Sequence, residues 1–104
     1  MNILLVCGAG ASTSLLVTKM LKVAKELGEE HNIRAIAQTA IKSELPKADV
    51  VLLGPQITFM LDSIKELADG KGIPVAVIRM QDYGMCDGAK VLEYAKKLKT
   101  SAVV

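Results

Sequence analysis

Short apolar runs recur along the chain, separated by longer amphipathic stretches. The runs cover residues 2–7, 33–38, 49–53 and 73–78. The first of them, NILLVC, shows no alternation of polar and apolar positions, which is typical of a strand buried on both faces of a parallel sheet. We predict one strand in each of the four ranges.

The amphipathic stretches after the first, third and fourth runs predict three helices. In the first helix, apolar residues recur at helical spacing as far as Leu27, and Gly28 is suited to ending it. The second helix opens at Gly54-Pro55, because proline fits the first helical position. The third helix begins near Asp87, which we expect to be its N-cap.

The remaining segments are predicted to lack regular structure. Residues 39–47 are expected to form a loop with one helical turn, 79–88 a loop with two glycines, and 100–104 a frayed tail. Strands that alternate with helices predict an α/β fold, in which helices cover both faces of a parallel sheet. Pro74 cannot donate a ladder hydrogen bond, so we expect the fourth strand at an edge of that sheet.

The composition fits one domain, residues 1–104, working in the cytoplasm. Hydrophobic residues make up 51% of the chain and aromatic residues 3%, so the core is expected to be aliphatic. The net charge of +2 and the absence of a basic cluster with aromatic residues argue against nucleic-acid binding. The apolar runs are far shorter than the ~18 residues of a membrane span, and we recognise no signal peptide.

Three side chains are suited to metal or redox chemistry: Cys7, Cys86 and His31. We expect both cysteines to be free thiols, because disulfides are rare in the cytoplasm. His31 and the two cysteines complete no zinc site unless a carboxylate joins them. The sequence therefore predicts neither a metal nor a cofactor.

The stretch CGAGASTS, residues 7–14, is close to several phosphate-binding patterns. The Walker A pattern is excluded because no glycine–lysine pair is present, and a C-x-x-C redox pair is excluded by Gly10. The dinucleotide pattern G-x-G-x-x-G fails only at Thr13, so a nucleotide-binding module stays an alternative. The tyrosine-phosphatase pattern C-x5-R-[ST] fits Cys7 and Ser14 but has Thr13 in place of arginine. A small cysteine-dependent phosphatase is therefore a second alternative.

Cys7 is the candidate catalytic residue of this stretch. It ends the first strand, and α/β folds bind ligands beyond the carboxyl ends of their strands. Loop amides that converge on an anion, next to a helix N-terminus, stabilise a thiolate and equally a phosphoryl group on sulfur. The expected phosphate-binding residues are Gly8, Ala9, Gly10, Ala11, Ser12, Thr13 and Ser14, of which the last three are also candidate N-caps.

The missing arginine bears on the type of reaction. Arginine clamps a phosphate through two hydrogen bonds and stabilises its transition state, which benefits a hydrolase. A carrier that must keep its phosphoryl group until a partner accepts it does not need that residue.

Three stretches carry a resemblance to a known family: LLVCGAGASTSLLVTKM at 4–20, ADVVLLGPQI at 48–57 and YGMCDG at 83–88. With these, the chain resembles the cytoplasmic IIB subunits of the phosphoenolpyruvate-dependent sugar phosphotransferase system, of the lactose/cellobiose/chitobiose type. The resemblance extends to about Lys99. It implies a four-stranded parallel sheet of order 2-1-3-4, similar to low-molecular-weight tyrosine phosphatases.

The resemblance also implies a role and partners. Cys7 is expected to accept a phosphoryl group from a phosphohistidine on a IIA subunit. It then passes the group to a sugar held by the membrane IIC subunit, and a β-glucoside or a disaccharide such as cellobiose is the expected sugar. The chain is expected to be a monomer without direct membrane insertion. Family members commonly have a larger residue at Ala11 and Ser or Ala at Gly8, and these departures bear on partner choice.

Four residues outside the loop are further candidates. Gln56 follows the third strand, and we expect it and Tyr83 to contact the loop or a partner. Asp82 and Asp87 lie where phosphatases of this shape carry a general acid. For Asp87 we favour the N-cap reading, because the last helix begins next to it.

Overall fold

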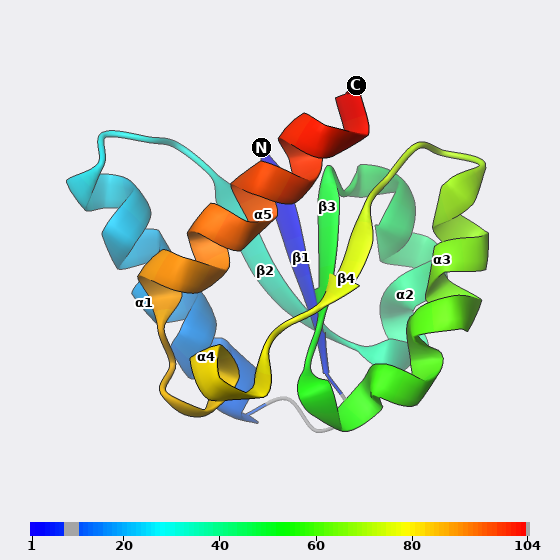
Figure 1. Ribbon diagram of the computed structural model, residues 1–104, viewed down its shortest axis with the longest axis horizontal. Helices are drawn as coiled ribbons and strands as arrows, with labels where there is room; N and C mark the ends of the chain where they lie inside the picture. The colour runs from blue at the N-terminus through cyan, green and yellow to red at the C-terminus, as the bar shows by residue number, and fades with distance from the viewer. Residues whose placement is uncertain (8–10, 104) are drawn as a thin grey trace.

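The computed structural model describes residues 1–7 and 11–103, and the side chains of 1–7 and 13–100. Its centre is a sheet of four parallel strands, shown in Figure 1, in the order β2-β1-β3-β4. The strands are β1 (Asn2–Cys7), β2 (Asn32–Ala37), β3 (Val50–Leu53) and β4 (Val75–Val77). Both the predicted order and the edge position of the fourth strand are confirmed.

Helices cover both faces of the sheet, as the alternation of elements predicted. On one face, α1 (Ala11–Glu26) packs beside α5 (Gly88–Val103), and α3 (Leu61–Asp69) lies on the other face (Figure 1). Successive β1 side chains alternate between the two layers: Ile3 and Leu5 join the core under α1 and α5, whereas Leu4 and Val6 join the core under α3. Each of these four side chains is at most 2% exposed, so β1 is buried on both faces.

Two predicted loops are helical. Residues 38–47 form η1 (Gln38–Ala40), α2 (Ile41–Glu44) and η2 (Leu45–Lys47) in direct succession. Ile41 and Leu45 are four residues apart and both buried in the core beneath α3, so one helical face is anchored there. Within 79–88, Met80–Gly84 forms α4, and the predicted frayed tail continues α5 to Val103.

The turn after β3 begins a helix as predicted. Gly54 is the extended N-cap residue and Pro55 follows at the first helical position. The segment η3 (Pro55–Met60) is interrupted at Ile57, whose φ of −116° and ψ of 30° are not helical, before α3 begins at Leu61. Ile57 is buried, so the kink directs it into the core.

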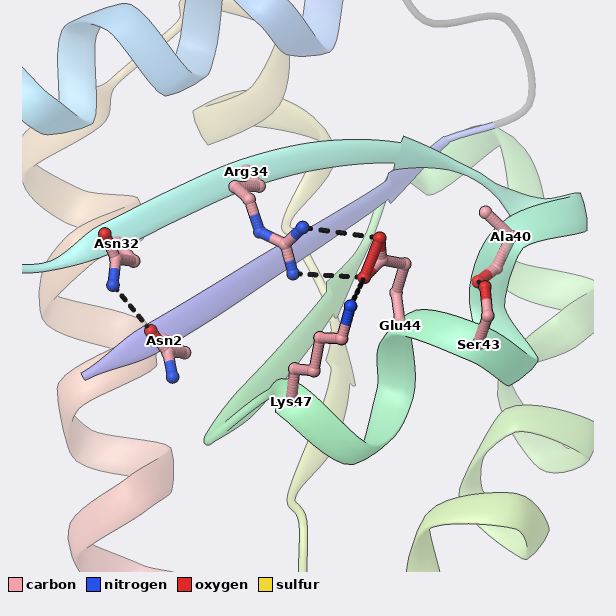
Figure 2. Close-up of polar contacts among 7 residues, drawn as sticks. All are labelled: Asn2, Asn32, Arg34, Ala40, Ser43, Glu44 and Lys47. Carbon is pink, nitrogen blue, oxygen red and sulfur yellow. Dashed lines mark hydrogen bonds and ion pairs between the residues drawn. The ribbon is translucent and has the colours of Figure 1, made fainter.

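Polar contacts tie the outer strand to the helical segment that follows it, as Figure 2 shows. Arg34 of β2 donates to Glu44 of α2 through both terminal nitrogens, at 3.4 and 3.3 Å, and Lys47 lies 3.5 Å from the same carboxylate. The hydrogen bond from Arg34 is the largest cause of the lowered pKa of Glu44, and the interaction with Lys47 lowers this pKa further. Asn32 also donates to the Asn2 side chain at 3.0 Å, across β2 and β1.

A second polar group lies at the amino edge, the side of the sheet where the strands begin. Glu29 accepts a hydrogen bond from Lys96 of α5 at 2.7 Å and contacts the His31 ring at 2.8 Å. The other ring nitrogen of His31 lies 3.2 Å from the Met1 amino group. The His31 side chain is only 12% exposed. The hydrogen bond from Lys96, followed by that with His31, lowers the pKa of Glu29.

Glu29→Gln is expected to reduce stability at neutral pH and to have less effect in acid. Because the folded-state pKa of Glu29 is lowered, its carboxylate stabilises the fold above the ordinary pKa of 4.5, and this contribution is lost as the pH falls through the lower folded-state value. Urea denaturation over a pH series from about 7 to about 2.5 measures the difference. Glu93→Gln is the matched control, because its pair with Lys97 joins two exposed side chains of one helix. A difference between Glu29→Gln and wild type that stays constant with pH contradicts the assignment.

Candidate active site at the carboxyl edge

Cys7 lies at the middle of the carboxyl edge, the side of the sheet where the strands end. It is the last residue of β1 and pairs in register with Ala37, the last residue of β2, while Val6 pairs with Leu53 at the end of β3. Its thiol lies 3.9 Å from the Ile36 carbonyl, at the limit of a weak sulfur hydrogen bond. Cys7 is 3% exposed. The sulfur therefore has little free surface in this conformation.

Part of the predicted phosphate-binding loop, residues 8–14, lies outside the described residues. This applies to Gly8, Ala9 and Gly10, and to the side chains of Ala11 and Ser12. The backbone of α1 begins at Ala11, four positions after Cys7, and its first turn carries no acidic residue. A helix N-terminus presents unpaired N–H groups and the positive end of the helix dipole, which favours an anion near Cys7.

The hydroxyl residues do not precede α1 but lie within its first turn. Since the helix already begins at Ala11, the prediction that Ser12, Thr13 or Ser14 is the N-cap is wrong. Thr13 is 1% exposed, and its hydroxyl lies 3.2 Å from the Tyr83 hydroxyl. Ser14 is exposed, and its carbonyl accepts a hydrogen bond from Thr18. Of the two described hydroxyl side chains in this turn, those of Thr13 and Ser14, only that of Thr13 is therefore held beneath the surface.

Tyr83 and Gln56 both lie beside the turn that follows β3. A β-carbon placed on Gly54 comes within 3.7 Å of the Tyr83 ring and 2.8 Å of the Gln56 side-chain oxygen. The Gly54 amide in turn donates to the Val6 carbonyl at 2.9 Å, one residue before Cys7. Glycine allows these close approaches because it has no side chain. The structure thus brings Tyr83 and Gln56 to the edge where Cys7 lies.

The two aspartates have different surroundings. Asp87 accepts a hydrogen bond from the Lys90 amide at 3.1 Å and directly precedes α5, so its predicted role as N-cap is confirmed. Asp82 is 8% exposed and lines a cavity of about 180 Å³ together with Arg79 and Tyr94. Neither geometry favours a general acid directed at Cys7.

Gln38 at the same edge was not singled out from the sequence. It follows Ala37, the strand partner of Cys7, and its side-chain oxygen is buried without a hydrogen-bond partner in the described part of the chain. A polar residue directly after a strand was the available signal, because parallel strands end at the same edge.

Exposed apolar side chains surround the carboxyl edge. Figure 1 shows the start of α1, η3 and α4 gathered near the ends of β1 and β3. Leu15 of α1 is 52% exposed, Phe59 of η3 79%, and Met80 and Met85, in and just after α4, 76% and 72%. Apolar surface of this kind, near a site, is typical of an interface with another protein.

The described residues show no metal-binding cluster, disulfide or membrane-spanning helix. Within 1–7 and 11–103, no group of three or more His, Cys, Asp or Glu side chains is arranged to hold a metal ion. Neither Cys7 nor Cys86 forms a disulfide. Across the same described ranges, none of the helices combines the length and apolar character needed to span a membrane.

Comparisons with known proteins agree on one family. Residues 2–94 match the family described as PTS system, Lactose/Cellobiose specific IIB subunit. The oligo-beta-mannoside-specific EIIB component of Bacillus subtilis is 49% identical over 97 residues, covering 93% of this chain and 94% of that protein. The galactose-specific EIIB component of Lactococcus lactis subsp. cremoris is 48% identical over 101 residues, covering 92% and 94%.

A solved structure is similar over nearly the whole chain. The cellobiose-specific phosphotransferase IIB component from Borrelia burgdorferi has a TM-score of 0.82 and is 44% identical, with 98% of this chain and 94% of that chain covered. The three proteins are thus named for three different sugars at similar identity to this chain.

Proposed function

Because the chain belongs to the lactose/cellobiose-specific IIB subunits of the sugar phosphotransferase system, we propose that Cys7 carries the phosphoryl group between its partners. IIB components work with IIA and IIC subunits in the phosphorylation of sugars. Here the IIA subunit is the phosphohistidine donor, and the membrane IIC subunit holds the sugar that accepts the group. The chain acts as a monomeric single domain, residues 1–104, in the cytoplasm.

The transfer consists of two in-line displacements. In the first, the Cys7 thiolate attacks phosphorus, an S–P bond forms, the N–P bond breaks and the histidine of IIA recovers its electron pair. In the second, a sugar hydroxyl oxygen attacks, an O–P bond forms, the S–P bond breaks and the thiolate returns. The hydroxyl proton leaves to a base or water, so atoms and charge balance without a redox partner.

The observation that carries the proposal is the position of Cys7 at the carboxyl edge, four positions before the start of α1 at Ala11. We propose that the amides of residues 8–14 hold the oxygens of the phosphoryl group, and that the unopposed positive end of α1 stabilises their charge. Thr13 occupies the position of the phosphatase arginine, and its hydroxyl contacts Tyr83. This arrangement favours a carrier over a hydrolase, because no described cation stands at that position.

The apolar side chains around the edge supply the docking surface for IIA and IIC in this proposal. Leu15, Phe59, Met80 and Met85 are exposed on elements that lie near the site, and Gln56 is the polar contact near its centre. Because Cys7 is 3% exposed, docking must open the approach to sulfur before the phosphoryl group can reach it.

A β-glucoside or a disaccharide such as cellobiose is the proposed sugar. Relatives of similar identity are named for oligo-beta-mannoside, galactose and cellobiose, so identity alone does not separate these substrates. The IIC subunit binds the sugar in this scheme, and sugar choice therefore depends on IIC rather than on residues of this chain.

Incubation with the phosphorylated IIA subunit of the same system tests the function. We expect one phosphoryl group to appear on the chain by intact-mass analysis, on Cys7 by peptide mapping, and to leave when IIC-containing membranes and cellobiose are added. Oligo-β-mannosides and lactose serve as alternative acceptors. A chain that takes up no phosphoryl group, or takes it up at a residue other than Cys7, overturns the proposal.

A further inference from the structure

Tyr83 connects three segments that are far apart in the sequence. It belongs to α4, its hydroxyl lies 3.2 Å from the Thr13 hydroxyl in the first turn of α1, and its ring lies beside Gly54 after β3. Seventy positions separate Tyr83 from Thr13. A single side chain thus joins the element after β4 to the elements after β1 and β3.

The contacts of Tyr83 lead to Cys7 from two directions. Through Thr13 it reaches the first turn of α1, which only residues 8–10 separate from Cys7. Beside its ring, the Gly54 amide donates to the Val6 carbonyl, the residue that precedes Cys7. Tyr83 therefore contacts the segment that follows Cys7 in the chain and lies beside the turn that is hydrogen-bonded to the residue before it.

Thr13 is suited to transmit this constraint. It is 1% exposed in a first turn whose other described hydroxyl residue, Ser14, is on the surface. A buried hydroxyl is held by its hydrogen bond, because water cannot replace the partner. Loss of the Tyr83 hydroxyl leaves Thr13 without this contact and releases the first turn.

We propose that Tyr83 is a positioning residue for phosphoryl transfer, which holds the first turn of α1 against the β3 turn so that the helix N-terminus stays aligned with the Cys7 sulfur. This inference rests on the proposed carrier function. Tyr83 acts through Thr13 rather than on the phosphoryl group. Removing either hydroxyl should therefore give the same defect, and removing both should give no more than one.

The test measures single-turnover transfer from phosphorylated IIA to the chain. Tyr83→Phe and Thr13→Val are each expected to slow transfer at saturating IIA about tenfold, because small misalignments of reacting groups cost one to two orders of magnitude. The half-saturating IIA concentration is expected to change less than about twofold, since the docking side chains remain. The ³¹P chemical shift of the phosphocysteine should move in both variants by the same amount.

Three further variants separate positioning from general damage. The double variant Tyr83→Phe/Thr13→Val should be as slow as either single variant, and Thr13→Ser, which keeps the hydroxyl, should recover most of the rate lost in Thr13→Val. Tyr94→Phe is the matched control, because Tyr94 lies on α5 in the cavity beside Asp82. Thermal unfolding of each variant confirms that it is folded.

The possible failures are distinguishable. If the wild-type chain accepts no phosphoryl group, both the proposed function and the positioning role of Tyr83 are wrong. If wild type is active and Tyr83→Phe transfers at the same rate, the positioning role alone is wrong. If the double variant shows the product of the two single effects, or if Thr13→Val is unaffected, Tyr83 does not act through Thr13.

Discussion

Cys7→Ser is expected to leave the chain folded and to reduce phosphoryl transfer to sugar by at least about three orders of magnitude. A serine hydroxyl is not ionised at neutral pH and is a far weaker nucleophile than a thiolate, while no described general base stands beside it. The replacement of sulfur by oxygen is nearly isosteric at the end of β1, so little packing is lost. The readout is sugar phosphorylation with phosphorylated IIA, IIC-containing membranes and the variant.

Cys86→Ser is the matched control for this experiment. Cys86 lies between α4 and α5, is partly buried and is the other cysteine of the chain, and it forms no disulfide. It is expected to retain wild-type transfer, and circular dichroism melting should show both variants folded. Sugar phosphorylation by Cys7→Ser at the wild-type rate would rule out a phosphocysteine carrier.

Gly88→Ala is expected to destabilise the fold by about 3 kcal/mol, at the upper end of the usual cost of overpacking. A β-carbon on Gly88 would lie 2.7 Å from the Lys19 carbonyl carbon and 2.8 Å from both its oxygen and the Met20 nitrogen. All three are backbone atoms in the middle of α1, so no side-chain rotation relieves the contact. The start of α5 and α1 must separate instead, which opens the core between them.

Urea denaturation of Gly88→Ala against Gly84→Ala measures this effect. Gly84 ends α4, and a β-carbon there meets no atom within 4 Å, so alanine at this position should change stability by less than about 1 kcal/mol. Equal stability of the two variants would show that α1 and α5 do not approach as closely as described.

Most of the fold could be predicted from local sequence patterns. The apolar runs located all four strands, Pro55 and Asp87 located helix starts, and the family resemblance gave the strand order. Residues 80–84 were predicted as loop because a five-residue helix is too short for an apolar period and two glycines lie nearby. In the structure this segment is helical, with Asp82 buried and Tyr83 packed against the core. Tertiary contacts of this kind leave no periodic pattern in the local sequence.

The sequence predicts a candidate chemistry for the site, and that chemistry stays a prediction: a cysteine after a buried strand is the candidate reactive residue, and its neighbourhood favours an anion. The expected contact of Tyr83 with the loop is found at Thr13, but the sequence did not indicate which loop residue it would reach. The hydroxyls of residues 12–14 looked equivalent as caps or phosphate ligands, yet Thr13 is buried against Tyr83 and Ser14 is exposed. The difference between Thr13 and Ser14 arises from Tyr83, seventy positions away, and the spacing of residues within the loop does not show which hydroxyl Tyr83 contacts.

The two ends of the sheet give this small protein independent sites for adaptation. β1 spans six residues, so about 17 Å separate its first residue, at the edge where the Glu29 group lies, from Cys7 at its end. Effects of substitutions at such separation usually add without coupling. Substitutions at Glu29 can therefore change how stability depends on pH without altering the surroundings of Cys7, and substitutions near Cys7 can change without altering that dependence.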